Sequence, residues 1–237
     1  MSACILAVDS STECLALALA FDGRAWTVEE NGGPQASARV LPSMMALLAE
    51  AGAPLQQLQA IAFGRGPGAF TGLRTACSVA QGLAFGSGKP VLALDSLMLV
   101  AEDARGAAEV FDVWVAMDAR MGEIYAGRYV HQDGEWTVRD APALYELDAL
   151  HARWSAEPPA AVAGSALAAF GDRLPTGGAQ CFPAEKSRAA ALLRVAQWAW
   201  RRGDTLDAAE ALPLYLRDKV ALTTAERQAQ RPAKAAT

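Results

Sequence analysis

Histidine and paired cysteine are scarce in this sequence of 237 residues. The only histidines, His131 and His151, stand far apart, and the four cysteines show no Cys-x-x-Cys spacing. The sequence therefore lacks the histidine and cysteine residues needed for a zinc site, a two-histidine metalloprotease helix or a Ser-His-Asp triad. The cysteine spacing is also not that of a disulfide framework, so we expect reduced, buried cysteines in a cytoplasmic protein.

The sequence also has no excess of basic residues and no long apolar run. Lysine and arginine number 21 against 26 acidic residues, a net charge of −5. This balance argues against a large nucleic-acid surface, because phosphate binding needs clustered basic charge. No apolar run approaches the ~18 residues of a membrane helix. The first residues, MSACILAVDSST, contain no basic side chain and do not match a signal peptide. We expect no membrane contact.

The composition that remains is globular, with 52% hydrophobic and 20% charged residues. Apolar runs of strand length alternate with helical periodicity in the first half of the chain. The order β-β-β-α-β-α-β predicts an α/β lobe with a mixed sheet. The expected strands cover 4–9, 14–21, 26–30, 59–63 and 91–94, and the expected helices cover 37–51 and 72–85.

The second half partly repeats the first. Asp9 ends an apolar strand that is followed by a strand and an Asp-Gly turn, and Asp118 ends a similar unit. This repeat predicts two related lobes, over 1–100 and 101–222. The second lobe is expected to hold strands at 112–117, 123–130, 135–139 and 160–163. Helices are expected at 96–105 and 188–202, and 223–237, almost without large apolar side chains, is predicted to be disordered.

A glycine-rich segment, GRGPGAFTGLR, follows the strand at 59–63 and precedes a helix. Glycines at this density indicate positive φ angles or close approach of the backbone to another group. Gly64, Gly66 and Gly68 satisfy a loose dinucleotide pattern, but Pro67 removes a backbone donor and the acidic residue expected ~20 positions on is absent. A tight structural turn and an anion-binding helix N-terminus are both compatible with this segment.

A carboxylate and three hydroxyl groups, Asp9-Ser10-Ser11-Thr12, end the first expected strand. Such groups hold phosphate or, through water, a magnesium ion. They also satisfy turn amides in ordinary hairpins. Both interpretations remain open at the level of sequence.

Small residues form a row along the helix at 72–85, and the helix at 37–51 is apolar over more than half of its circumference. A row of small side chains lets another helix approach closely, and excess apolar surface favours a partner. The candidate interface residues are Arg39, Val40, Met44, Gly72, Leu73, Ala76, Ala80 and Ala84.

The run AFGRGPGAFTGLRTACSVAQGLAFGSGKP at 62–90 resembles the signature of one family closely. The segments LAVDSSTECLALAL, MDARMGEIYAGRY and PLYLRDKVA resemble it in the same order. The chain is similar to the TsaB (YeaZ) family, a paralogue of TsaD in the actin-like, M22 glycoprotease-like superfamily.

The resemblance implies an α/β fold of the actin/Hsp70/sugar-kinase (ribonuclease H-like) type, with two related lobes and mixed sheets. It implies a non-catalytic scaffold or activator, without cofactor or metal, that binds the catalytic subunit TsaD together with the ATPase TsaE and can form a homodimer. That complex places a threonylcarbamoyl group on the adenosine next to the tRNA anticodon, so contact with tRNA is indirect. TsaD holds its metal with a His-x-x-x-His pair, whereas Pro34–Pro42 here contains no histidine and has Ala36-Ser37 where relatives have His-Ser.

The rival hypothesis is an enzyme of the same fold, an ATPase or a small-molecule kinase, in which Asp9, Ser10, Ser11, Thr12, Gly64, Gly66 and Gly68 cradle phosphates. Asp118 would then be the candidate carboxylate of the second lobe. A peptidase of the M22 type is a further alternative, for which no nucleophile–base pair is found. Titration calorimetry with Mg-ATP distinguishes the scaffold from the ATPase.

The small-residue row yields a test by substitution. If it faces a partner, Ala76→Arg and Ala80→Arg give a folded protein that no longer binds TsaD or itself, because a buried unpaired charge costs about 3–5 kcal/mol. If the row packs inside the lobe, the same substitutions unfold the protein.

Overall fold

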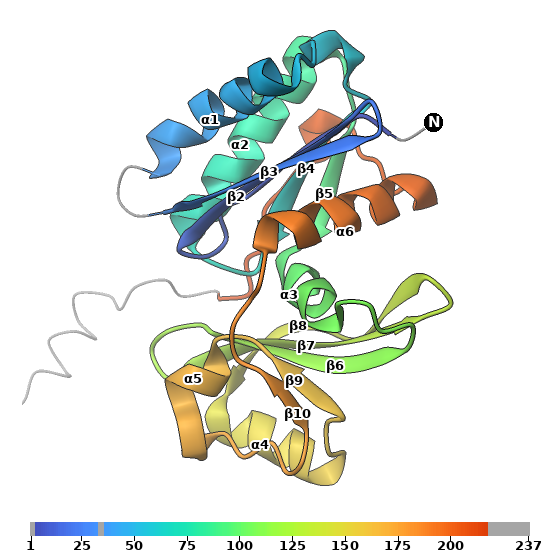
Figure 1. Cartoon of the computed structure of the whole chain (residues 1–237). Helices are drawn as coiled ribbons and strands as arrows, with labels where there is room; N and C mark the ends of the chain where they lie inside the picture. Colours follow the sequence, from blue (N-terminus) through green and yellow to red (C-terminus); the bar gives the residue numbers. More distant parts are fainter. Residues whose placement is uncertain (1–2, 33–35, 218–237) are drawn as a thin grey trace, which may run out of the picture.

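The computed structural model describes residues 3–32 and 36–217. The chain folds into two α/β lobes, each built on a five-stranded sheet, with two helices between them (Figure 1). Within the described ranges, no helix combines the length and the apolar character that crossing a membrane requires. The segment 223–237, predicted to be disordered, lies outside the described residues.

The first sheet has the strand order β3-β2-β1-β4-β5. The strand β1 pairs antiparallel with β2 and parallel with β4, and β4 pairs parallel with β5. Both faces of β1 and β2 are buried, which explains their unbroken apolar sequences. The strands are β1 (Ile5–Asp9), β2 (Cys14–Phe21), β3 (Arg24–Asn31), β4 (Ala60–Gly66) and β5 (Val91–Asp95). Helices α1 (Ala36–Ala51) and α2 (Phe70–Ser87) cover the face that points away from the second lobe (Figure 1).

The second sheet repeats this topology in the order β10-β9-β6-β7-β8. Its strand β6 pairs antiparallel with β7 and parallel with β9, as β1 does with β2 and β4. The strands are β6 (Phe111–Asp118), β7 (Glu123–Gln132), β8 (Glu135–Glu146), β9 (Ala161–Ala163) and β10 (Gln180–Phe182). Helices α4 (Leu147–Ala156) and α5 (Ala166–Phe170) cover its outer face (Figure 1). The predicted α/β fold of two related lobes is therefore confirmed.

Two helices, α3 (Ser96–Arg105) and α6 (Arg188–Arg202), lie between the sheets (Figure 1). Each follows the last strand of one lobe. Together they close a single apolar cluster that joins both sheets. The helix α6 packs on β1 and β2, so the assignment of 101–222 to the second lobe needs correction. After α6 the chain runs along the first sheet, where Leu206 bridges to Val91.

Secondary structure was predicted best where apolar periodicity was long. The helices at 96–105 and 188–202 and the strand at 14–21 have the predicted bounds. The strand predicted at 135–139 continues to Glu146, and α4, α5 and β10 were not predicted because they are short or weakly apolar. Cys181 is exposed, contrary to the expectation of buried cysteines, whereas Cys4 and Cys77 are buried.

The row of small residues on α2 faces inward. Ala76, Ala80 and Ala84 are buried against the first sheet and α1, in the same cluster as Val40 and Met44. Leu73 is also buried. The expectation that these six residues contact a partner is therefore corrected, because the small side chains let α2 lie close to its own lobe.

Burial of this row reverses the outcome expected of Ala80→Arg. The arginine would overpack the core and leave a charge without a partner, so unfolding should become easier by about 3–5 kcal/mol, or folding should fail. Ser78→Arg, on the exposed side of the same helix, is the control and should shift stability by less than about 0.5 kcal/mol. Urea unfolding measures both. An Ala80→Arg protein with the stability of the wild type would contradict this packing.

Candidate inter-lobe site

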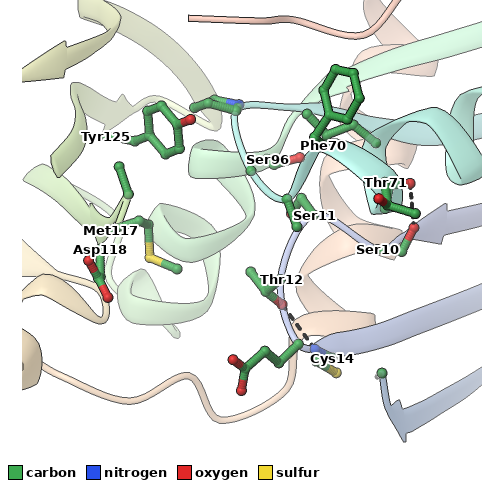
Figure 2. A pocket seen from close by; sticks show the side chains of 18 of the residues that line it. Ser10, Ser11, Thr12, Cys14, Phe70, Thr71, Ser96, Met117, Asp118 and Tyr125 are labelled. Carbon is green, nitrogen blue, oxygen red and sulfur yellow. Dashed lines mark hydrogen bonds between the residues drawn. The ribbon is translucent and has the colours of Figure 1, made fainter. Parts of the chain in front are cut away.

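A cleft of about 1480 Å³ opens between the lobes. Figure 2 shows Ser10, Thr12 and Thr71 of the first lobe on one side and Asp118 and Tyr125 of the second on the other. The polar groups come from the turn after β1 and from the start of α2. The cleft is thus the place where the two motifs found in the sequence meet.

The glycine-rich loop is packed against the turn after β1. A Cβ atom added at Gly64 would lie 1.7 Å from Oδ2 of Asp9, and one added at Gly72 would lie 1.8 Å from the carbonyl oxygen of Ser10. At Gly68 the nearest atom would be the carbonyl oxygen of Ser11, at 2.3 Å. These three glycines are needed because another part of the chain occupies the space where a side chain would stand. The close approach expected at the loop is to the protein itself.

Hydrogen bonds join the two motifs. The amide of Ala69 donates to the carbonyl of Ser11 at 2.7 Å, and the hydroxyl of Ser10 donates to the carbonyl of Gly72 at 2.8 Å. The hydroxyl of Thr12 accepts from the amide of Cys14 at 3.2 Å. The hydroxyl groups of Ser10 and Thr12 therefore support the turn and the loop, as in the structural interpretation of this segment.

The carboxylate of Asp9 is completely buried and fully bonded. Its Oδ1 accepts from the hydroxyl of Ser11 at 2.8 Å and from Nε of Arg188 at 2.8 Å, and its Oδ2 accepts from the hydroxyl of Ser96 at 2.9 Å. Burial alone would lower the pKa of Arg188, but the charges of Asp9 and Glu185 outweigh it and raise that pKa. Arg188, an arginine from α6, is therefore charged, and its Nε faces the Asp9 carboxylate.

Sequence reasoning missed Arg188 because 179 positions separate it from Asp9. One signal was present. Arg188 is the first residue of α6, directly after the N-cap Ser187, where the helix dipole disfavours positive charge. A cation at that position indicates an acidic partner elsewhere in the fold.

Asp118 occupies the position in the second lobe that Asp9 occupies in the first, at the end of β6. Its carboxylate accepts from the amide of Arg120 at 2.8 Å, and the Arg120 guanidinium also reaches Glu13 across the cleft at 2.8 Å. Asp118 thus forms an ion pair with Arg120 at the cleft edge, whereas Asp9 forms one with Arg188 at the cleft floor.

The segment 211–217 runs along the cleft and contacts both lobes. The amide of Leu214 donates to the carbonyl of Arg65 at 2.7 Å, and Nε of Arg74 donates to the hydroxyl of Tyr215 at 3.0 Å. On the other side, Arg217 donates to the carbonyl of Ala119 at 3.0 Å. This segment closes one side of the cleft.

A partly buried acid also links the lobes. The hydroxyl of Tyr129 donates to Oδ2 of Asp95 at 2.6 Å, from β7 to the end of β5. Burial raises the pKa of Asp95, against the lowering effect of this hydrogen bond. Burial and the negative charge of Asp95 raise the pKa of Tyr129. The hydrogen bond between Tyr129 and Asp95 therefore holds the two lobes together.

Of the candidate interface residues, only Arg39 is exposed, and Gly72 is half-buried against Ser10. The Arg39 guanidinium donates to the carbonyl of Asn31 at 2.6 Å and pairs with Glu30 at 3.2 Å. The large exposed apolar side chains of these helices are others, namely Leu41, Met45, Phe70 and Phe85. The periodicity of α1 indicated excess apolar surface but did not identify the outward positions.

The packing of the loop predicts the effect of Gly64→Ala. The new methyl group would collide with the Asp9 carboxylate, which its partners hold in place, so the substitution should cost about 3 kcal/mol of stability. Gly86→Ala is the control, since no atom lies within 4 Å of its added Cβ, and it should stabilise α2 by about 0.5 kcal/mol. Calorimetric melting measures both, and equal melting temperatures for the two variants would contradict the packing.

Comparisons with known proteins agree with this architecture. A family model described as TsaD, tRNA N6-adenosine threonylcarbamoyltransferase, matches residues 30–183. Two solved structures from Pseudomonas aeruginosa, one described as YeaZ and one as similar to peptidase YeaZ, are 39% identical in sequence. They superpose with TM-scores of 0.81 and 0.82, covering 90% and 91% of this chain and the whole of theirs.

Two curated relatives, matched over nearly their whole length, carry the same name. The tRNA threonylcarbamoyladenosine biosynthesis protein TsaB of Escherichia coli is 33% identical over 92% of this chain and 96% of its own length. The protein of the same name from Haemophilus influenzae is 32% identical over 91% of this chain and 94% of its own. On this agreement in sequence and fold, the chain belongs to the TsaB (YeaZ) family of tRNA threonylcarbamoyladenosine biosynthesis proteins.

Proposed function

We propose that this chain is a non-catalytic subunit of the machinery that makes threonylcarbamoyladenosine in tRNA, and that it binds the catalytic subunit TsaD through the outward sides of α1 and α2. The observation that carries the proposal is a surface of two adjacent helices whose central turns have no charged residue. No charged residue occurs between Arg39 and Glu50 on α1, or between Arg74 and Lys89 around α2.

This uncharged face is apolar where it is exposed. Leu41 and Met45 on α1 are each 44% exposed, and Phe85 on α2 is 63% exposed. Smaller exposed residues, among them Ala49 and Gly82, leave room for a partner's side chains. A surface helix in water normally carries charge along its outer side, so two helices whose central turns lack it favour burial in a complex.

The state of Asp9 supports a role other than catalysis. A carboxylate that acts in phosphoryl transfer or proton transfer must reach a metal ion or the reacting group. Here Asp9 is buried and bonded to Arg188 and two serines. In our proposal TsaD and the ATPase TsaE carry out the catalytic steps, and this chain is a scaffold in the complex.

Contact with tRNA is assigned to the partners. The chain has a net charge of −5, and binding to a polyanion depends on clustered basic residues that release counterions. The same face could also join two copies of this chain. A homodimer would then compete with the complex with TsaD for one surface.

The double variant Leu41→Glu/Met45→Glu tests the face. Glutamates one turn apart would place two unpaired charges in the interface, which should weaken binding to TsaD by about 100-fold or more, since such a charge costs on the order of 3 kcal/mol. Titration calorimetry with purified TsaD measures the affinity. Threonylcarbamoylation of tRNA by TsaD and TsaE, with and without this chain, measures the consequence.

Val138→Glu is the matched control, because Val138 is also 44% exposed but lies on β8 of the second lobe. It should bind TsaD and support modification as the wild type does. Sedimentation of each variant alone reports the homodimer. Full affinity in the folded double variant would show that TsaD does not use this face, and loss in the control would show that the effect is not specific to it.

A further inference from the structure

The polar network at the cleft floor has one member, Arg188, whose own role the proposed function leaves open. Arg188 is a buried arginine, 3% exposed, that comes from α6 and still lines the inter-lobe cleft. An ion pair with Asp9 would use only some of the N–H donors of its guanidinium. The acceptors of the other N–H groups indicate the role of Arg188 in the cleft.

Oxygen atoms surround the Arg188 guanidinium. Nε donates to Oδ1 of Asp9 at 2.8 Å, and Nη1 donates to Oε2 of Glu185 at 2.7 Å. Nη2 donates to the hydroxyl of Ser11 at 2.8 Å and to the carbonyl of Ser96 at 3.4 Å. Two carboxylates, a hydroxyl and a carbonyl are the ligand types that hard divalent cations take in proteins. In this chain the guanidinium of Arg188 donates hydrogen bonds to these oxygen atoms.

The arrangement also holds the two places where the chain passes between lobes. Ser96 begins α3, which follows the first sheet, and Arg188 begins α6, which returns from the second. Both are bonded to the carboxylate of Asp9, through Oδ2 and Oδ1 respectively. The return segment is fixed further by Asp103, which accepts from the amides of Lys186 and Ser187 at 2.7 and 2.9 Å.

We propose that Arg188 is an internal cation: its guanidinium occupies the position at which Asp9 and Glu185 would otherwise bind an external divalent ion, and in this position it joins α3 and α6 at the cleft floor. The cleft is then closed to a metal-bound phosphate at Asp9, although the turn and the glycine loop have the residue types of such a site. This inference does not depend on partner binding by α1 and α2.

The test removes the guanidinium and offers a cation in its place. Arg188→Ala in the full chain leaves Asp9 buried without a counter-charge, so its melting temperature should fall by about 10 °C. Millimolar MnCl2 or guanidinium chloride, at concentrations far below the denaturing range, should then restore at least half of that loss, because binding to the folded state alone raises its stability. The wild type should not respond to either ion.

The control is Asp9→Asn/Arg188→Ala, which removes both charges. It should melt above Arg188→Ala and should not respond to Mn²⁺ or guanidinium, because the fully buried carboxylate is gone and the remaining one, Glu185, is partly exposed. Binding of Mn²⁺, followed by electron paramagnetic resonance, should be present in Arg188→Ala and absent from the double variant and the wild type.

Three results would overturn the proposal. The first is a wild type that binds Mn²⁺ in a way that Asp9→Asn abolishes, because the position would then be open to external ions. The second is a folded Arg188→Ala protein that responds to neither cation. If Arg188→Ala is recovered only as an aggregate, the double variant decides: a soluble, folded double variant supports the internal cation, and an aggregated one is the third contrary result.

Discussion

The need to pair the buried carboxylate of Asp9 with a positive charge constrains how the two lobes are joined. Asp9 ends the central strand β1, where burial of an unpaired charge would cost more than the net stability of many domains allows. Arg188 meets this requirement, and it can do so only if the chain returns from the second lobe and places α6 on the first sheet. The position of α6, the joining of the lobes and the floor of the cleft all follow from this pair.

Duplication explains why the cleft has polar residues on both sides. The two lobes repeat one order of strands, and the residues that follow β1 and the residue that ends β6 lie on opposite sides of the cleft (Figure 2). The residues at these equivalent places have different surroundings. Asp9 is enclosed by α6 and the glycine loop, whereas Asp118 bonds to its own neighbour Arg120 near solvent. One inherited backbone therefore holds a structural ion pair at one end and an accessible one at the other.

The fold could be predicted from the sequence to a large extent because its signals are local. Apolar runs and helical periodicity depend on neighbours within a few positions, and the bounds of β2, α3 and α6 were obtained from them. The family resemblance at 62–90 added the type of fold, with two related lobes. The short elements α5 and β10 carry too few apolar positions for a period to be visible.

The candidate site was harder, since its determinants are contacts between distant residues. The glycine loop and the turn at Asp9 were both found, but neither motif shows that the other fills its space. A row of alanines on α2 looks the same whether it meets the lobe's own sheet or a partner, and here it meets the sheet. Arg188 had only a weak local signal, a positive charge at a helix start.

The long separation between Asp9 and Arg188 has a consequence for biosynthesis. Translation at about 5–20 residues per second makes the arginine roughly 10–35 s after the aspartate. Until then one face of β1 and β2 lacks α6 and the carboxylate lacks its counter-charge, so the first half of the nascent chain is not a complete folding unit. The two lobes, although they repeat one topology, are therefore expected to acquire their stability together and late, after α6 has left the ribosome.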